Sequence, residues 1–506
     1  MTPHLLRVYK SAEMPPRTQL LAWKLAALAA DDAPIDPAVE AMILNRIIDN
    51  AGPAVAALAR HPVANARAQA LAHPHAGGAT VFGMPRGVRV ACEWAAWANA
   101  TAVRELDFHD TFLSVDMNHP GDMISAIVAV GQQCAASGQD LIRGIAAAYE
   151  IDVCLSKSIC LHEHRIDHLT HIAAGMVGGI GAMLRLPVEV IYQALNHVVH
   201  VTITTRQSRK GEISSWKAHA PAHAAKLAVE AVDRALRGET SPSPIYEGDD
   251  SIIAWLLDGP RAEYTIHLAD AGEAKRGILE TYTKAYSAEF HSQAMIDLAF
   301  RMRRRIPDLA RIREVVIHAS RHTDRIIGTG SGDPQKFDPK ATRETLDHSV
   351  MYIFAVALED GAWHHVTSYA PERAARPSTV ALWKRIRTVE DPSWTRRYLS
   401  AEPRERAMGG RVVITMEDGA TIEDSIDFAD AHTYGARPFG RNDYIAKFHT
   451  LASEFASDAE RERFVNAVLG LPGAGAGALI ELTVEAPESA RACAGLRPGL
   501  FERAAI

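Results

Sequence analysis

The chain has 506 residues, more than one hydrophobic core ordinarily organises, so two or three packed bodies are expected. With 54 Lys and Arg against 61 Asp and Glu, the formal net charge is −7, which argues against a nucleic-acid-binding protein. An apolar fraction of 47% and a charged fraction of 23% are typical of a globular protein rather than a disordered one.

Cysteine spacing argues against cysteine-based sites. The chain has five cysteines, at positions Cys92, Cys134, Cys154, Cys160 and Cys493. No two of them form a CxxC pair, so neither a disulfide framework nor a thiolate site for zinc or an iron–sulfur cluster has the spacing it needs. We therefore expect no metal cluster and no cofactor.

Neither a signal peptide nor a membrane span is predicted. Lys24 interrupts the only apolar stretch near the N-terminus, and no small-residue cleavage site follows that stretch. The longest lipid-like run, residues 171–184, has 14 residues, whereas a membrane-spanning helix needs about 20. We expect a cytoplasmic protein that contacts neither membranes nor nucleic acid.

The first half of the chain is predicted to be helical. From residue 19 to about residue 237, apolar residues recur at intervals of three and four, as in packed helices. Gly52, Gly138 and Gly238 follow such segments and are predicted to end helices. Residues 238–250 are dense in Gly, Ser, Pro and Asp, which predicts a connecting loop.

The pattern changes after about residue 276. Residues 313–320 are rich in β-forming residues, and residues 411–428 alternate on both sides of Asp418-Gly419, which predicts a hairpin. After residue 439 helical spacing resumes. The expected fold is mainly α, with a large all-helical domain at 1–275, a smaller α+β lid domain at 276–440, and a helical tail at 441–506 that packs back on the helical domain.

Three conspicuous motifs favour structural roles. The glycines of 175–181 lack the GxGxxG spacing and a preceding strand, which favours close helix packing over a nucleotide loop. The basic run 301–306 favours a solvated helix face. The histidines of 162–171 can place two or three imidazoles on one helical face, but the chain has no HExxH pattern, so we predict packing roles and no bound metal.

Residues 105–122 form a dense polar cluster beside two phenylalanines. Asp107, His109, Asp110, Thr111 and His119 all fall in this span. A carboxylate near an imidazole fixes its tautomer and raises its basicity, which is what a general base needs. Turns and helix caps made by Asp and Asn would explain the cluster equally well if it stood alone.

Cationic residues occur in two further segments. Arg206, Arg209 and Lys217 lie in one, and Lys284 and His291 lie where the helical pattern gives way to the mixed one. Cations at a domain junction suit an anionic substrate bound in an interdomain cleft.

At these residues the sequence resembles the MmgE/PrpD family, over nearly the whole chain, and most closely its dehydratase branch. The resemblance is carried by LDF-x-DT with a following HPG (residues 106–121), by Asp167-His168 ahead of a small-residue helix, by SWK ending at Lys217, and by KAYSAEFHSQ (residues 284–293). It implies a helical domain, a smaller α+β lid, a homodimer, and a cleft between the domains.

The same resemblance implies a set of site residues. Relatives that act on cis-aconitate line their cleft with residues matching Asp107, Thr111, His119, Lys217, Lys284 and His291, and His168 matches a further histidine if a short gap is allowed. We expect His119, oriented by Asp107, to be the main acid/base group and His291 the complementary proton donor or a further carboxylate contact. Lys217 and Lys284 are expected to clamp substrate carboxylates, with Thr111, His168 and Arg206 as further binding residues.

The implied activity is cofactor-independent dehydration of 2-methylcitrate, a tricarboxylate, in propionate breakdown, together with interconversion of citrate and cis-aconitate. Decarboxylation of cis-aconitate and epimerisation of a dicarboxylate are alternatives within the family. A non-catalytic helical binding protein is the alternative from another class. The longer spacing between Lys284 and His291 than in the decarboxylase branch disfavours decarboxylation.

Overall fold

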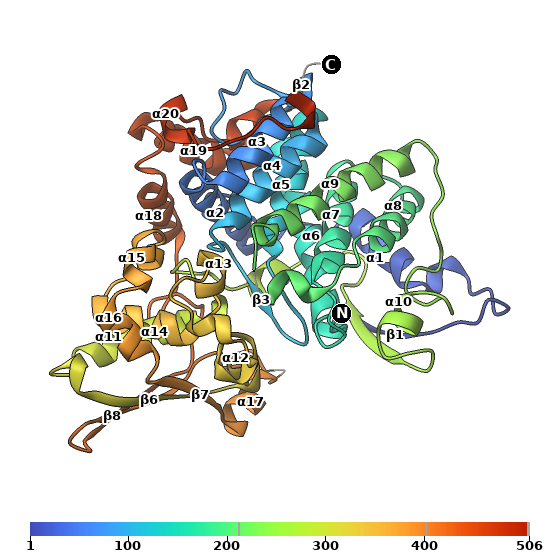
Figure 1. The fold of residues 1–506 in the computed structure, drawn as a ribbon. Helices are drawn as coiled ribbons and strands as arrows, with labels where there is room; N and C mark the ends of the chain where they lie inside the picture. The colour runs from blue at the N-terminus through green and yellow to red at the C-terminus, as the bar shows by residue number, and fades with distance from the viewer. Residues whose placement is uncertain (211–212, 401, 503–506) are drawn as a thin grey trace.

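The computed structural model describes residues 1–210, 213–400 and 402–502, and it has a mainly α fold with a smaller α+β domain (Figure 1). The helices of the first domain are α1 (Leu21–Ala30), α2 (Pro37–Ala56), α3 (His61–Leu71), α4 (Cys92–Glu105), α5 (Ile124–Gln133), α6 (Gly138–Ser158), α7 (Leu169–Met183), α8 (Val188–Val201), α9 (Trp216–Leu236) and α10 (Ile252–Leu256). Its strands are short: β1 (Thr2–Arg7) pairs with β5 (Glu263–Leu268), β3 (Phe112–Leu113) pairs with β4 (Met117–Asn118), and β2 is Pro74–Ala79.

Helix α7 is buried along its whole length at the centre of the first domain. Its glycines let α6 approach closely, because a Cβ on Gly179 would lie 2.8 Å from the carbonyl oxygen of Gly144, and a Cβ on Gly144 would lie 2.7 Å from that of Gly179. The predicted packing role of the glycines at 175–181 is confirmed.

The second domain is built on a four-stranded sheet in the order β7-β6-β8-β9. The central strand β6 (Ile312–Ala319) runs parallel to β7 (Ile386–Glu390) and antiparallel to β8 (Gly410–Met416), which forms the predicted hairpin with β9 (Thr421–Ile426). Gly419 supplies the positive φ of that turn, at 86°. The helices are α11 (Gln293–Arg303), α12 (Arg321–Ile327), α13 (Arg343–Leu346), α14 (Val350–Asp360), α15 (Pro371–Ala374), α16 (Pro377–Trp383) and α17 (Pro392–Tyr398).

The end of the chain returns to the first domain. Helix α18 (Arg441–Ala452) packs on α2, and α19 (Asp458–Leu469) and α20 (Glu488–Arg491) follow. Figure 1 shows these red helices beside the blue N-terminal ones. The first hydrophobic core therefore combines residues 6–279 with 439–490, and the second core is drawn from residues 286–429.

Two glycines predicted to end helices do not do so. Gly52 lies inside α2, where a Cβ would come within 3.1 Å of Leu451 on α18. Gly138 is the first residue of α6, where a Cβ would collide with the carbonyl oxygen of Leu471. Both glycines serve close packing against the returning C-terminal segment, which the local sequence does not reveal. Gly238, with φ of 87°, does follow α9.

Two further predictions concern the basic run 301–306 and membrane-spanning helices. The basic run 301–306 ends α11, with Arg301, Arg304 and Arg305 exposed as predicted. Within the described residues, no helix is both long enough and apolar enough to cross a bilayer.

Candidate active site

A cavity of about 60 Å³ lies where the two domains meet. Its lining residues are Arg104, Asp107, Thr111, Leu113, Met117, Asn118, His119, His162, His168, Arg206 and Arg209 from the helical domain, and Glu289, Ile326 and His348 from the α+β side. The cavity has room for about four to six waters.

Asp107 is placed by a tight turn at the end of α4. Its φ is 50°, in the left-handed region that aspartate tolerates better than most residues, and its backbone N–H donates to the carbonyl of Arg104 over 3.0 Å. The turn folds the Asp107 carboxylate back against the Arg104 guanidinium.

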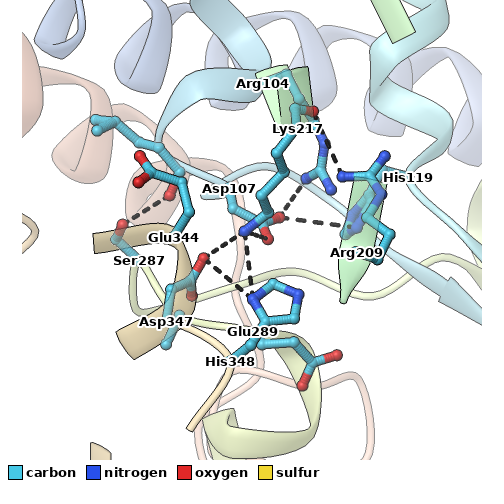
Figure 2. Close-up of polar contacts among 12 residues, drawn as sticks. Arg104, Asp107, His119, Arg209, Lys217, Ser287, Glu289, Glu344, Asp347 and His348 are labelled. Atoms are coloured by element: carbon cyan, nitrogen blue, oxygen red, sulfur yellow. Dashed lines mark hydrogen bonds and ion pairs between the residues drawn. The ribbon is translucent and has the colours of Figure 1, made fainter. Parts of the chain in front are cut away.

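Three cations converge on the Asp107 carboxylate, and Figure 2 shows two of them, Arg104 and Lys217. Besides Arg104, Lys217 Nζ lies 2.9 Å from Oδ2, and Lys284 Nζ lies 2.6 Å from Oδ1 and 2.9 Å from the backbone oxygen. Burial alone would raise the pKa of Asp107, but Arg104, Lys217 and Lys284 together hold it well below its usual range. Asp107 is therefore a carboxylate, and its single negative charge offsets part of the charge of the three cations.

The two lysines consequently differ from their expected role. Neither Lys217 nor Lys284 borders the cavity, and both ammonium groups bond to protein carboxylates. In this closed arrangement the two lysines hold the Asp107 carboxylate in place, and they do not face a substrate.

His119 borders the cavity with a defined tautomer. Its Nδ1 lies 3.0 Å from the carbonyl oxygen of Asp110 and 2.8 Å from the Thr111 hydroxyl. A carbonyl only accepts, so Nδ1 carries the hydrogen and Nε2 keeps its lone pair. Nε2 lies 3.7 Å from Oδ1 of Asp107. Thr111 and Asp110 thus orient the ring, whereas Asp107 was expected to do so.

The electrostatic environment keeps His119 neutral. Burial, and next the Arg104 charge, hold the pKa of His119 well below its usual value. A neutral imidazole with a free Nε2 lone pair can accept a proton, and Asp107 would then stabilise the imidazolium that forms.

Asp110, whose carbonyl oxygen fixes the tautomer of His119, is itself held in place by hydrogen bonds to its carboxylate. Its carboxylate accepts from the Gly121 N–H over 2.7 Å and from the Tyr149 hydroxyl over 2.9 Å. A Cβ on Gly121 would lie 2.6 Å from Asp110 Oδ1, so the HPG turn requires glycine at this position.

Arg206 and Arg209 lie on the short turn Arg206–Arg209 and face the cavity, while residues 211–212 of the same cationic segment lie outside the described residues. Arg209 Nε lies 3.1 Å from Asp167 Oδ2. His168, at the start of α7, lies 2.9 Å through Nδ1 from the other oxygen of Asp167. Asp167 thereby aligns a guanidinium and an imidazole along one wall.

Several buried nitrogens of the cavity wall have no hydrogen-bond partner among the described residues. They are Arg104 Nε, Arg206 Nε, Arg209 Nη2 and His168 Nε2. Buried polar groups are rarely left unpaired, so a cluster of them around one cavity points to a ligand rich in acceptor oxygens.

His291 lies outside the cavity lining, although it was expected to contact the substrate. It is fully buried, with Nδ1 2.8 Å from Glu289 Oε1 and Nε2 3.3 Å from the Tyr398 hydroxyl. Glu289 borders the cavity in its place.

The remaining histidines of 162–171 are bonded within the protein. His162 pairs with Asp116, and His171 Nε2 lies 3.0 Å from the Ile159 carbonyl oxygen. Across the described part of the chain, no three His, Cys, Asp or Glu side chains are grouped to hold a metal ion.

With this geometry in place, the comparisons decide the family. Residues 19–265 match the MmgE/PrpD N-terminal domain, and residues 286–471 match the MmgE/PrpD C-terminal domain. The chain belongs to the MmgE/PrpD family.

Relatives within the family are named dehydratases. The 2-methylcitrate dehydratase of Cupriavidus necator is 25% identical over 346 residues, which cover 65% of this chain and 69% of that protein. The probable 2-methylcitrate dehydratase of Saccharomyces cerevisiae is 24% identical over 351 residues, covering 65% of each. A fungal protein named alkylcitrate dehydratase phiI is 24% identical over 361 residues, covering 65% of this chain and 67% of that protein. The alignments thus span about two thirds of these proteins, and they support a hydro-lyase family.

In this MmgE/PrpD chain, the sequence-based site residues divide into two groups. Asp107, Thr111, His119, His168 and Arg206 border the cavity, whereas Lys217, Lys284 and His291 lie behind it.

Sequence reasoning missed several lining residues, notably Arg104, Glu289 and His348. Arg104 looks like an ordinary basic residue in the last turn of a helix. His348 had a usable signal, because Asp347-His348 before the apolar α14 repeats the Asp167-His168 pattern before α7.

Proposed function

We propose that this MmgE/PrpD chain is a hydro-lyase that dehydrates 2-methylcitrate to a 2-methylaconitate in propionate breakdown. The observation that carries the proposal is the cavity wall, where unpartnered guanidinium nitrogens of three arginines surround one neutral histidine. Three substrate carboxylates would supply the acceptors that these donors lack. The names of the relatives agree with this substrate class.

The proposed reaction begins with His119. Its Nε2 removes the proton from the carbon next to a carboxylate, and Asp107 at 3.7 Å stabilises the resulting imidazolium. Negative charge then develops on that carboxylate, where the fixed charges of the arginines stabilise it. Loss of the hydroxyl as water completes the double bond.

Apolar residues of the cavity favour an alkylated substrate. Leu113, Met117 and Ile326 interrupt the otherwise polar lining. A methyl group packed against them gains about 0.8 kcal/mol per buried carbon, so citrate should be the poorer substrate. The same apolar residues favour longer alkylcitrates as a second candidate, in line with the fungal relative's name.

Substrate specificity tests the proposal. We expect kcat/KM for 2-methylcitrate to exceed that for citrate several-fold, with no carbon dioxide released from cis-aconitate. Release of carbon dioxide would favour the decarboxylase alternative. If the protein turned over neither 2-methylcitrate nor citrate, the proposal would be refuted. We also propose a homodimer, as the family resemblance implies, which sedimentation equilibrium measures directly.

A further inference from the structure

Glu289 and His291 lie two residues apart in the segment 284–293, and of these two only Glu289 borders the cavity. Glu289 lines the cavity, whereas His291 is fully buried behind it. The His291 ring stacks on Tyr398, with centroids 5.6 Å apart, and both ring nitrogens face protein groups. His291 can therefore act on a substrate only through Glu289.

Local geometry fixes the direction of the Glu289 carboxylate. Glu289 caps the short turn Phe290–Ser292, since its Oε2 accepts from the His291 N–H over 2.8 Å while Oε1 faces His291 Nδ1, also at 2.8 Å. Asp107 and Glu289 are the two carboxylates of the lining. Because three cations hold Asp107, Glu289 is the carboxylate that can exchange a proton.

The charges around Glu289 favour sharing of one proton between the Glu289 carboxylate and the His291 ring. Burial would raise the pKa of Glu289, but His291, and then Lys284, lower it below its usual value. At rest, the pair is a carboxylate beside a histidine. A tricarboxylate in the cavity would oppose that negative charge and draw the proton of the pair toward Glu289.

We propose that Glu289 protonates the departing hydroxyl, with His291 as its hydrogen-bonded partner in the proton transfer. This rests on the proposed dehydratase function. His119 Nε2 takes the proton from carbon, and the electrons of that C–H bond pass onto the neighbouring carboxylate. These electrons then return to form the C=C bond as the C–O bond breaks. The departing oxygen takes the proton from the Glu289 carboxyl and leaves as water. His119 then releases its proton to solvent and the Glu289–His291 pair takes one up, which restores the starting state.

In this scheme Glu289 is a catalytic residue and His291 a positioning residue. Figure 2 shows Glu289 and His348 at the lower edge of the site, with His119 and Arg209 at the right. All four border the same cavity, so a substrate between them can meet His119 and Glu289 together.

Other titratable groups surround the pair. Lys284 and Lys336 face Glu289, and Tyr398 of α17 and His322 of α12 face His291. Burial lowers the pKa of Lys336 to about 8 and that of His322 to about 4. Burial raises the pKa of Tyr398 well above its usual value. Between pH 5.5 and 7.0, these neighbours largely keep their protonation states, so a limb that moves within that range reports the pair.

Deuterium exchange separates the two proton transfers. In D2O, the Glu289→Gln variant should dehydrate 2-methylcitrate about 10² to 10⁴-fold more slowly than the native protein, with KM changed less than about threefold. Unreacted substrate recovered from Glu289→Gln should nevertheless carry deuterium, because His119 still removes the proton from carbon. His119→Ala should lose both dehydration and exchange. Glu314→Gln, a surface carboxylate on β6 paired with Arg387, is the matched control and should behave as the native protein.

The pH profile tests the role of His291. His291→Asn keeps an N–H donor for Glu289 but cannot hold the proton, so the alkaline limb of kcat should move to lower pH. A merely structural His291 would lower kcat without moving that limb.

The outcomes separate the proposal from the function it rests on. An inactive native protein would overturn both. If the native protein is active, two results would overturn the role of Glu289 alone. One is a Glu289→Gln variant that remains active, and the other is a Glu289→Gln variant that loses exchange together with dehydration. An unmoved alkaline limb in His291→Asn would overturn the role of His291.

Discussion

Lys217 on α9 donates to the Asp347 carboxylate across the domain interface, with Nζ 2.5 Å from Oδ2. Both side chains are buried, and Lys217 also reaches Asp107, so one ammonium group joins the cavity wall to the α+β domain. The closed arrangement of the two domains therefore depends on a buried charge as well as on apolar packing.

Asp347→Asn should destabilise the protein by about 3 kcal/mol, because removing one partner leaves a buried charge with less compensation. Chemical denaturation measures the change. Glu230→Gln breaks an exposed pair with Arg234 on the same helix, and it should cost less than about 0.5 kcal/mol. Equal changes in the free energy of unfolding for the two variants would show that the interdomain pair stabilises the protein no more than the exposed pair does.

Substrate binding should protect three distant segments together. The cavity lies where the two domains meet, so we expect the domains to separate for substrate entry and to close around the bound substrate. Hydrogen exchange with and without 2-methylcitrate should show protection in 105–122, 206–217 and 284–293 at once. Protection of one segment alone would mean that the three do not share the ligand.

The pH dependence of kcat/KM should reflect a neutral His119. Burial and then Arg104 hold its pKa well below 6.5, so the imidazole stays able to accept a proton as the pH falls through 6.5. After correction for ionisation of the substrate, kcat/KM should stay level there. Arg104→Gln removes a cation beside His119, so its acidic limb should move to higher pH. An acidic limb near 6.5 in the native protein would contradict the assignment.

A buried carboxyl far from the cavity predicts a pH-dependent stability. Burial raises the pKa of Glu247 to about 7, above its value of about 4.5 in the unfolded chain. The folded state therefore binds the proton more tightly, and stability is lost as the pH rises through 7. Glu247→Gln should stabilise the protein by about 3 kcal/mol at pH 8 and by much less at pH 5, measured by denaturation. No pH dependence of this difference would contradict it.

Sequence patterns predicted the elements better than the contacts between side chains. The hairpin at Asp418-Gly419 and the glycine-rich α7 followed from local chemistry, because turn geometry and helix spacing are local properties. The burial of Gly52 against Leu451 could not be predicted, since residues some 400 positions apart in the chain create that contact.

The site shows the same division. The polar cluster around Asp107 and His119 was found from its composition, but which cation would neutralise Asp107 depends on tertiary packing. Glu289 and His291 lie two residues apart in an irregular turn, where no helical or strand period indicates which side chain faces the cavity. Sequence reasoning therefore chose the histidine, and the structure places the glutamate in the lining.

Ultraviolet absorbance of the native protein mixed with 2-methylcitrate measures directly whether the protein is a dehydratase. The conjugated double bond of an aconitate-type product absorbs where the substrate does not. We expect a steady rise in absorbance. His119→Ala should slow this rise by at least about 10²-fold, and His75→Ala, at an exposed histidine outside the cavity, should retain it. No rise with the native protein, or an equal rise with His119→Ala, would contradict it.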